Sequence, residues 1–336
     1  MSDQSQMMSH SEWPTVSVVM PIRHEAKYLE QSVQSILLQT YPREFDICLA
    51  VAPSSDATEA IAQSLCAQNH RISVIENPSG KTASGLNAAI AHTKGQIVVR
   101  VDGHATLSPD YILNAVTTLR STGAANVGGI QRPTGRSVFE RAVARAMTSK
   151  FGTGGSKFHV GGQAGPTDSV YLGVFDRTRA EKVGWFDERL IRNQDYELNI
   201  RLRRDGATIW FDPNLWVDYQ PRSSLSQLAR QYFQYGWWKA KVVSLHPSSL
   251  RLRQSAPVLV TVVLLCSLAI SVINPLSLLL PLLYGLITMT VSFSQPRLSL
   301  PERLALLLIL PTMHLAWGLG FTLSLFSRKL KASSRG

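Results

Sequence analysis

The chain has 336 residues, enough for one large domain or two modest ones, and carries a formal net charge of +11. Its three cysteines, Cys48, Cys66 and Cys266, are widely spaced. This spacing excludes a disulfide framework or a zinc-finger site and fits a reducing compartment for the polar part of the chain. The first 13 residues are polar and lack an apolar signal core, so we expect no export of this part.

Short β-branched runs alternate with helical patterns over the first hundred residues. The runs cover 16–22, 45–52, 71–77 and 95–102, and the helical patterns cover 25–39, 59–68 and 82–93. This alternation predicts an α/β fold with a mostly parallel, doubly wound sheet and helices on both faces. Ligands bind such sheets where strands end at their carboxyl edges. Asp102 and His104 lie at one of these predicted ends.

The sequence becomes rich in glycine between about 120 and 170. Three glycine-rich pieces, at 123–129, 151–157 and 159–165, are typical of mobile loops that carry recognition on a rigid scaffold. A further helix is predicted from about Asn193, with Gly206 as its C-cap.

The chain becomes apolar near residue 254, and no Asp, Glu, Lys or Arg occurs from Gln254 to Pro296. Segments at about 257–274, 275–293 and 304–326 are each long enough to cross about 30 Å of hydrocarbon. We therefore predict a transmembrane helical region over 255–327. The last segment contains Pro311, so it either crosses fully or folds back.

Basic and aromatic residues gather beside these apolar segments. The stretch 221–254 is typical of an amphipathic, aromatic and basic interfacial helix, and residues 328–336 form a basic tail. Because the bases cluster there, we expect them to meet anionic lipid head groups, and we expect no nucleic acid partner.

Two separated acids are candidates for chemistry. Asp102, beside a flexible glycine, has the environment to hold Mg²⁺ or Mn²⁺, which would neutralise the diphosphate of a departing nucleotide; His104 would be a second ligand or a hydrogen-bond partner. Alternatively, Asp102 only caps a turn. Asp195 opens the predicted helix near 193, where the helix dipole alone favours an acid. The alternative is a general base that deprotonates an attacking hydroxyl.

Read in order, these features resemble family 2 glycosyltransferases of GT-A fold, a Rossmann-like arrangement, and within them the ExoA-like branch of bacterial exopolysaccharide assembly. The specific part is "DSVYLGVFDRTRAEKVGWFDERLIRNQDYELNIRLRRDGATIWFDPNLWVDYQPRSSLSQLARQYFQYGWWKA", and "VSVVMPIRHEAKYLEQSVQSILLQTYP" adds to it. The resemblance covers roughly residues 15 to 250. It implies a catalytic domain at 15–220, preceded by a polar tail at 1–14.

The resemblance also implies residue roles. Asp102 matches the first acid of the Asp-x-Asp metal motif, and Asp195 matches the catalytic base of an inverting enzyme. Pro21 and Glu25 fall where the family contacts the nucleoside, and Asn87 matches a position near the nucleotide. Residues expected near the donor or acceptor are Asp168, Gln194, Gln234, Trp237 and Trp238.

Some positions depart from the family pattern. His104 replaces the second metal-motif acid, and Gln194 replaces the acidic neighbour of Asp195. Strand two ends in Val51 and Ala52 in place of an acid pair, which leaves Asp56 as the nearby acid.

The motif Gln-x-x-Arg-Trp that holds a growing polymer in processive synthases reads Gln234-Tyr-Gly-Trp237-Trp238 here. We therefore favour transfer of a single sugar over a processive polysaccharide synthase.

The leading hypothesis is an inverting hexosyltransferase. It would move one sugar from a nucleotide-sugar donor, with a UDP-sugar favoured, to a hydroxyl of a lipid-linked acceptor at the inner leaflet. Nucleotide sugars are cytosolic, so the catalytic domain should be cytosolic on a multi-pass protein of the cytoplasmic membrane. The rival from another class is a catalytically degenerate, membrane-anchored scaffold that binds nucleotide sugars without turnover.

Overall fold

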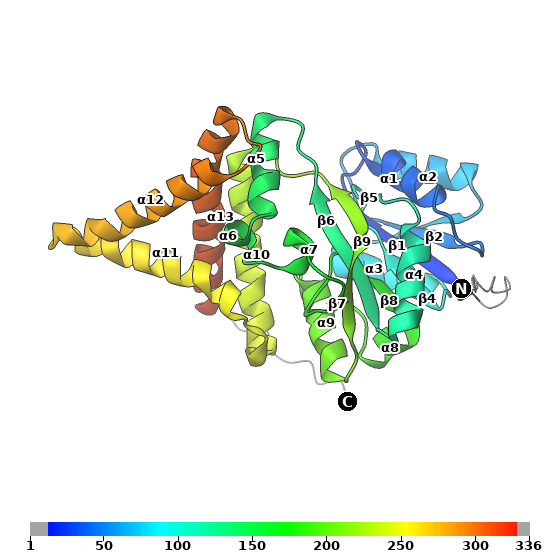
Figure 1. Cartoon of the computed structure of the whole chain (residues 1–336). Helices are drawn as coiled ribbons and strands as arrows, with labels where there is room; N and C mark the ends of the chain where they lie inside the picture. Colours follow the sequence, from blue (N-terminus) through cyan, green and yellow to red (C-terminus); the bar gives the residue numbers. More distant parts are fainter. Residues whose placement is uncertain (1–12, 328–336) are drawn as a thin grey trace, which may run out of the picture. The chain divides into compact units, whose positions relative to one another are not determined.

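The computed structural model describes residues 13–327, so the predicted tail at 328–336 and most of the predicted tail at 1–14 lie outside the described residues. These residues group into two compact units (Figure 1). The first unit contains 13–132 and 161–219, and the second contains 133–160 and 220–327. The segment 133–160 thus groups with the C-terminal helices, although it belongs to the stretch 15–220 that was predicted as the catalytic domain.

The first unit is built on one mixed sheet. Its strands in the described residues are β1 Val16–Ile22, β2 Asp46–Val51, β3 Ile72–Glu76, β4 Ile97–Arg100, β5 Thr106–Leu107, β6 Asn126–Pro133, β7 Gly165–Pro166, β8 Val174–Asp176 and β9 Ile209–Tyr219. Their order is β3-β2-β1-β4-β8-β6-β9-β5, with β7 paired to β9. Strands β1 to β4 pair in parallel, whereas β8 is antiparallel to both β4 and β6. The predicted mostly parallel α/β sheet is confirmed, and its later strands add an antiparallel half.

Helices cover both faces of this sheet. They are α1 Leu29–Leu37, α2 Thr58–Gln68, α3 Thr82–His92, α4 Tyr111–Thr122, α8 Arg177–Lys182 and α9 Gln194–Arg204. Successive side chains of a strand point to opposite faces, so Val18 and Met20 pack with α1, α2 and α4, whereas Val19 packs with α3, α8 and α9. Burial on both faces explains why these strands read as continuous apolar runs.

The first glycine-rich piece was wrongly predicted to be a mobile loop. Residues 126–129 of this piece belong to strand β6 and are buried. Gly128 lies against Val170 and the carbonyl of Tyr171, and a Cβ on Gly129 would overlap the backbone of Leu215 in β9. These glycines therefore allow neighbouring chains to approach closely inside the sheet.

The second unit is helical in the described residues. It contains α5 Val138–Met147, α6 Lys150–Thr153, α7 Lys157–Val160, α10 Leu225–Leu245, α11 Leu252–Ile270, α12 Leu279–Ser294 and α13 Leu300–Leu325, with short 3₁₀ turns at Pro247–Ser249 and Pro275–Leu278. Three segments are long and apolar enough to cross a membrane: Leu252–Ile270, Pro275–Ser294 and Leu300–Leu325. Helix α13 continues through Pro311, so the chain does not fold back at this residue.

Small residues let the helices of this unit approach closely. Added Cβ atoms on Gly236 of α10 and Gly320 of α13 would overlap the backbone of the facing helix, and one on Gly318 would overlap α11 at Thr261. This is the packing expected where van der Waals contact, and not water exclusion, drives helix association.

Candidate active site

Asp102 lies two residues beyond the end of β4, at the carboxyl edge of the parallel strands. Its Oδ1 accepts hydrogen bonds from Arg100, at 3.0 Å from Nη2 and 3.3 Å from Nε. The Arg100 side chain is 8% exposed and that of Asp102 is 21% exposed. The predicted metal-motif acid is therefore paired with a largely buried guanidinium.

Asp195 is the second residue of α9, as predicted. Asn193, which precedes the helix, has a left-handed φ of 62°. The Asp195 Oδ1 accepts from the backbone N–H of Tyr196 at 2.7 Å. Its Oδ2 lies 3.9 Å from Nη1 of Arg100, and the side chain is 31% exposed. Oδ1 of Asp195 thus accepts a hydrogen bond from the first turn of the helix, and Oδ2 faces Arg100 and solvent.

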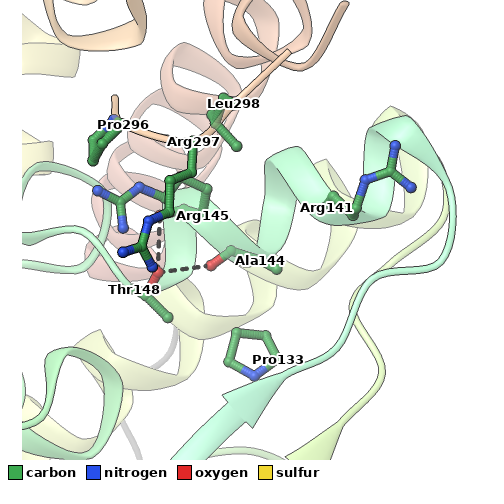
Figure 2. A pocket seen from close by; sticks show the side chains of 8 residues that line it. All are labelled: Pro133, Arg141, Ala144, Arg145, Thr148, Pro296, Arg297 and Leu298. Carbon is green, nitrogen blue, oxygen red and sulfur yellow. Dashed lines mark hydrogen bonds between the residues drawn. The ribbon is translucent and has the colours of Figure 1, made fainter. Parts of the chain in front are cut away.

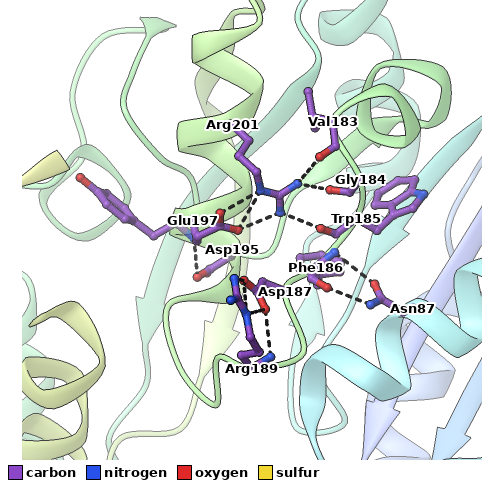
Figure 3. Close-up of polar contacts among 11 residues, drawn as sticks. Asn87, Val183, Gly184, Trp185, Phe186, Asp187, Arg189, Asp195, Glu197 and Arg201 are labelled. Atoms are coloured by element: carbon purple, nitrogen blue, oxygen red, sulfur yellow. Dashed lines mark hydrogen bonds and ion pairs between the residues drawn. The ribbon is translucent and has the colours of Figure 1, made fainter. Parts of the chain in front are cut away.

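An arginine on α9 holds the chain that leads to Asp195 (Figure 3). Arg201 pairs with Glu197 one helical turn earlier, at 2.8 Å between Nη2 and Oε2. Its guanidinium also donates to the carbonyl oxygens of Val183, Gly184 and Trp185. Because one side chain satisfies several loop carbonyls, it fixes α9 against the preceding loop.

Asn87 on α3 holds the same loop from the other side (Figure 3). Its amide donates to the carbonyl of Phe186 at 2.8 Å and to Glu188 at 2.9 Å, and its Oδ1 accepts from the N–H of Phe186 at 3.1 Å. Asn87 also lines a hollow of about 510 Å³ together with Lys94 and Arg177. Its predicted place near the nucleotide stays a prediction, and its visible contacts join α3 to the loop.

The two predicted acids, 93 positions apart in the chain, converge on Arg100. Among the described residues, Nη1 of Arg100 is buried and has no hydrogen-bond partner. Sequence reasoning missed this residue, although a cation inside the apolar run at 95–102 was the available signal.

Charge keeps the carboxyl of Asp102 ionised. Burial on its own would raise the pKa of Asp102, but the positive charge of Arg100, with His104 and Arg192 adding to it, holds the pKa below its usual value. Asp102 therefore carries a negative charge at neutral pH.

His104 contacts the predicted nucleoside residue Glu25. The two side chains lie 2.7 Å apart between Nδ1 and Oε1. Pro21 lies in β1, opposite Ala50 of β2. The loop after β1 is held by Asp56, which accepts from the N–H of Ala26 at 3.3 Å and from Thr58 Oγ1 at 2.6 Å. In the structure, Asp56 thus ties together the loops that follow β1 and β2.

The aromatic rings of Tyr171 and Tyr219 lie near Asp102 and His104. The ring of Tyr219 lies 6.1 Å from that of His104 and 6.5 Å from that of Tyr171. Burial, with the charge of Asp102 adding to it, raises the pKa of Tyr171 well above its usual value. The phenol of Tyr171 is therefore neutral near Asp102.

Asp102 and His104 are the residues that would hold a divalent cation whose coordination is completed by substrate. Oδ2 of Asp102 accepts no hydrogen bond within residues 13–327. The same residues contain no group of three or more His, Cys, Asp or Glu side chains placed to hold a metal by themselves. Mg²⁺ is commonly bound by one or two carboxylates together with substrate phosphates, and this donor set agrees with such a site.

The other predicted residues are more scattered. Gln194 is buried at the start of α9, and Asp168 lies between β7 and β8 in the first unit. Gln234, Trp237 and Trp238 lie on α10 of the second unit, where Trp237 stacks on Phe233 with ring centres 6.0 Å apart. The structure therefore brings Asp102, His104, Glu25 and Asp195 to one edge.

Known proteins resemble this chain over most of its length. A family model described as glycosyl transferase family 2 matches residues 17–184. Succinoglycan biosynthesis protein ExoA of Rhizobium meliloti (strain 1021) is 31% identical over 257 residues, which cover 75% of this chain and 78% of that protein. A dolichyl N-acetyl-alpha-D-glucosaminyl phosphate 3-beta-D-2,3-diacetamido-2,3-dideoxy-beta-D-glucuronosyltransferase of Methanococcus voltae is 25% identical, covering 68% of this chain and 74% of that protein.

A solved structure shows the same fold. The mannosyltransferase PcManGT from Pyrobaculum calidifontis, in complex with GDP-Man and Mn²⁺, superposes with a TM-score of 0.62 and 19% sequence identity. The match covers 94% of this chain and 88% of that chain. The predicted GT-A architecture is thereby confirmed.

Proposed function

Because the chain belongs to glycosyltransferase family 2, we propose that it is an inverting hexosyltransferase that moves one sugar from a nucleotide donor to a lipid-linked hydroxyl acceptor. Glycosyltransferase activity in exopolysaccharide or glycan synthesis is the coarse function that the comparisons support. The inverting mechanism, the hexose and the acceptor are our proposals. The observation that carries the mechanism is the convergence of Asp102 and Asp195 on Arg100.

Asp195 is the proposed general base. Its Oδ2 accepts no hydrogen bond among the described residues and faces partly open space. An acceptor hydroxyl bound next to it can donate its proton to that oxygen and attack the anomeric carbon from the side opposite the leaving nucleotide. Attack from the opposite side inverts the configuration at that carbon.

Arg100 sets the distance between the two acids. Its guanidinium binds Asp102 through Nη2 and Nε, and Nη1 points toward Asp195. The planar fork of an arginine fixes such a pair more rigidly than a lysine would. We assign Arg100 as the positioning residue that aligns the base with the donor site.

Asp102 and His104 are the proposed ligands of Mg²⁺ or Mn²⁺. When bound there, the cation neutralises charge on the diphosphate. PcManGT holds GDP-Man and Mn²⁺ in the same fold, which supports a nucleotide sugar as the donor. Glu25 and Pro21 would contact the nucleoside, and we test UDP-sugars first and GDP-mannose second.

The acceptor is proposed to be carried by a lipid at the inner leaflet. Three apolar helices follow the catalytic unit in the chain, and the similar protein of Methanococcus voltae is named for a dolichyl phosphate sugar. Arg297 lies between the second and third of these helices, and Arg303 lies in the first turn of the third, which favours a cytoplasmic loop there and a cytosolic catalytic unit. Protease protection of an N-terminal tag in sealed inverted vesicles tests this orientation, and protection of the tag would contradict it.

A donor screen with two variants tests the function. Membranes containing the full chain are supplied with Mn²⁺, a polyprenyl-linked saccharide fraction and one labelled sugar nucleotide at a time. We expect Asp195→Asn to bind the donor normally and to transfer at a rate lower by about 10² to 10⁴-fold, because only proton removal is lost. We expect Asp102→Ala to lose the response of the rate to Mn²⁺.

Asp205→Asn is the matched control, because Asp205 ends the same helix and pairs with Lys182 at 2.8 Å. It makes the same chemical change away from the site and should keep full activity. Normal transfer by Asp195→Asn would contradict the assigned base. Nucleotide binding without transfer from any donor would favour the scaffold, and products longer than one added sugar would favour a processive synthase.

A further inference from the structure

A basic hollow lies in the second unit, between α5 and the loop that joins α12 to α13 (Figure 2). Its volume is about 470 Å³. The residues that line it are Pro133, Arg141, Ala144, Arg145, Thr148, Pro296, Arg297 and Leu298. Three of these side chains are arginines and none is an acid, so the lining favours an anion.

The three arginines differ in how their charge is compensated. Arg141 donates from Nε to Oε1 of Glu302 at 2.5 Å, and Figure 2 shows its guanidinium directed away from the other two. Arg145 has a neutral partner, Oε1 of Gln295, at 2.7 Å from its Nε. Within residues 13–327, Arg297 forms no hydrogen bond or ion pair. Arg145 and Arg297 therefore bring uncompensated positive charge to one hollow.

Local structure holds this lining in place. Helix α5 begins with a capping box between Ser137 and Glu140 and packs with α13. On the other side, Arg303 donates to the carbonyls of Leu298 at 3.1 Å and Phe293 at 2.6 Å, which closes the loop between α12 and α13. Each side thus has its own anchoring contacts, and the Arg145–Gln295 and Arg141–Glu302 contacts join the two sides.

We propose that this hollow binds the phosphate group of a membrane lipid. Arginine presents donors in a planar fork that matches phosphate oxygens, and hydrogen bonds to a charged partner are the stronger ones. The loop at 295–299 joins two helices that are long and apolar enough to cross a bilayer, so it lies at the depth of the lipid head groups. A phosphate at that depth is attached to a lipid.

Two lipids carry this chemistry: an anionic phospholipid, and the polyprenyl lipid of the acceptor. The second source rests on the proposed function, whereas the binding site itself does not. We therefore test binding without any sugar nucleotide, so that a failure of transfer and a failure of this site are separate results.

The experiment uses the full chain in nanodiscs of phosphatidylcholine. Native mass spectrometry measures the binding of phosphatidylglycerol, of a polyprenyl phosphate and of inorganic pyrophosphate in separate arms. We expect one or both lipids to bind and the double variant Arg145→Gln, Arg297→Gln to weaken this binding by about tenfold or more for each arginine removed. Arg230→Gln is the matched control, because Arg230 is exposed on α10 and does not line the hollow.

Each outcome decides the inference. Tight binding of the polyprenyl phosphate assigns the acceptor lipid, and tight binding of phosphatidylglycerol assigns a membrane phospholipid. Binding by the double variant that equals that of the parent overturns the site, as does pyrophosphate binding as tight as that of the lipids. The variant Arg145→Lys, Arg297→Lys keeps the charge but loses the fork, and we expect an intermediate affinity with unchanged thermal unfolding. An equal loss in Arg230→Gln would also overturn the assignment, because it would reflect total charge alone.

Discussion

Arginines lie at both candidate sites. Arg100 in the first unit has carboxylate neighbours, whereas, among the described residues, Arg145 and Arg297 in the second unit do not. In the first unit, Arg100 is largely buried, pairs with Asp102 and faces Asp195. In the second unit, Arg145 has a neutral partner and Arg297 has none among the described residues. A neutralised arginine fixes the geometry of the acids around it, whereas an uncompensated one keeps its attraction for an arriving anion. The comparison therefore separates an arginine that positions groups from arginines that bind a ligand.

Among the variants that test this comparison, the largest effect should come from removing the positioning arginine. Arg100→Leu leaves Asp102 and Asp195 without their shared cation, so we expect transfer to fall by about 10²-fold. The free energy of unfolding should fall by about 2 kcal/mol, less than for a fully buried pair, because Asp102 keeps some contact with solvent. Donor turnover and chemical denaturation in detergent measure the two quantities.

Arg100→Lys sharpens the same test, because it keeps the charge and loses the fork. We expect it to recover most of the stability but only part of the activity. Full recovery of both would mean that charge alone matters, and Arg100 would then not be a positioning residue.

A smaller effect is expected from restoring the missing metal-motif acid. His104→Asp adds a carboxylate near Asp102 and Glu25, so the site gains attraction for a divalent cation. We expect the Mn²⁺ concentration that gives half-maximal transfer to fall by about tenfold. His104→Asn, which adds no charge, is the control. An unchanged Mn²⁺ requirement in His104→Asp would show that position 104 does not face the cation.

Local sequence signals were enough to predict the parallel half of the sheet. The runs that form β1 to β4 are apolar on both faces, and the helices between them have buried stripes such as Leu29, Val33 and Ile36. Such patterns depend on the residues of one segment alone. The antiparallel half was not predicted, because the pairing of β8 between β4 and β6 joins segments that are far apart in sequence.

In the candidate site, too, contacts between distant segments were not predictable from the sequence. Asp102 and Asp195 were proposed from the family motifs, but Arg100 was not, because its place beside both acids is seen only where α9 lies next to the end of β4. Likewise, Gly128 and Gly129 resemble a flexible loop in sequence, and only the close approach of Tyr171 and Leu215 shows why a strand requires them. The sequence can mark such a residue as unusual for its segment, as it does for Arg100, but it does not show which distant segments the residue joins.

The smallest effect concerns pH and contrasts two histidines. His104 in the first unit lies beside the carboxylate of Glu25. His159 on α7 of the second unit has an unpartnered, buried Nδ1 within the described residues, and burial, with the charge of Arg253 adding to it, lowers its pKa from 6.5 to about 4. Between these two pH values the unfolded chain binds more protons than the folded chain, so stability falls as the pH falls.

We therefore expect the free energy of unfolding to drop by about 1 kcal/mol between pH 7 and pH 5, since the imidazole keeps some contact with solvent. His159→Gln cannot take up this proton and should lose less stability over the same range. His70→Gln, at an exposed histidine that pairs with Glu44, is the control and should follow the parent. Thermal unfolding in detergent at a series of pH values measures the difference. Identical pH slopes for His159→Gln and the parent would show that the second unit does not respond to acid through this residue.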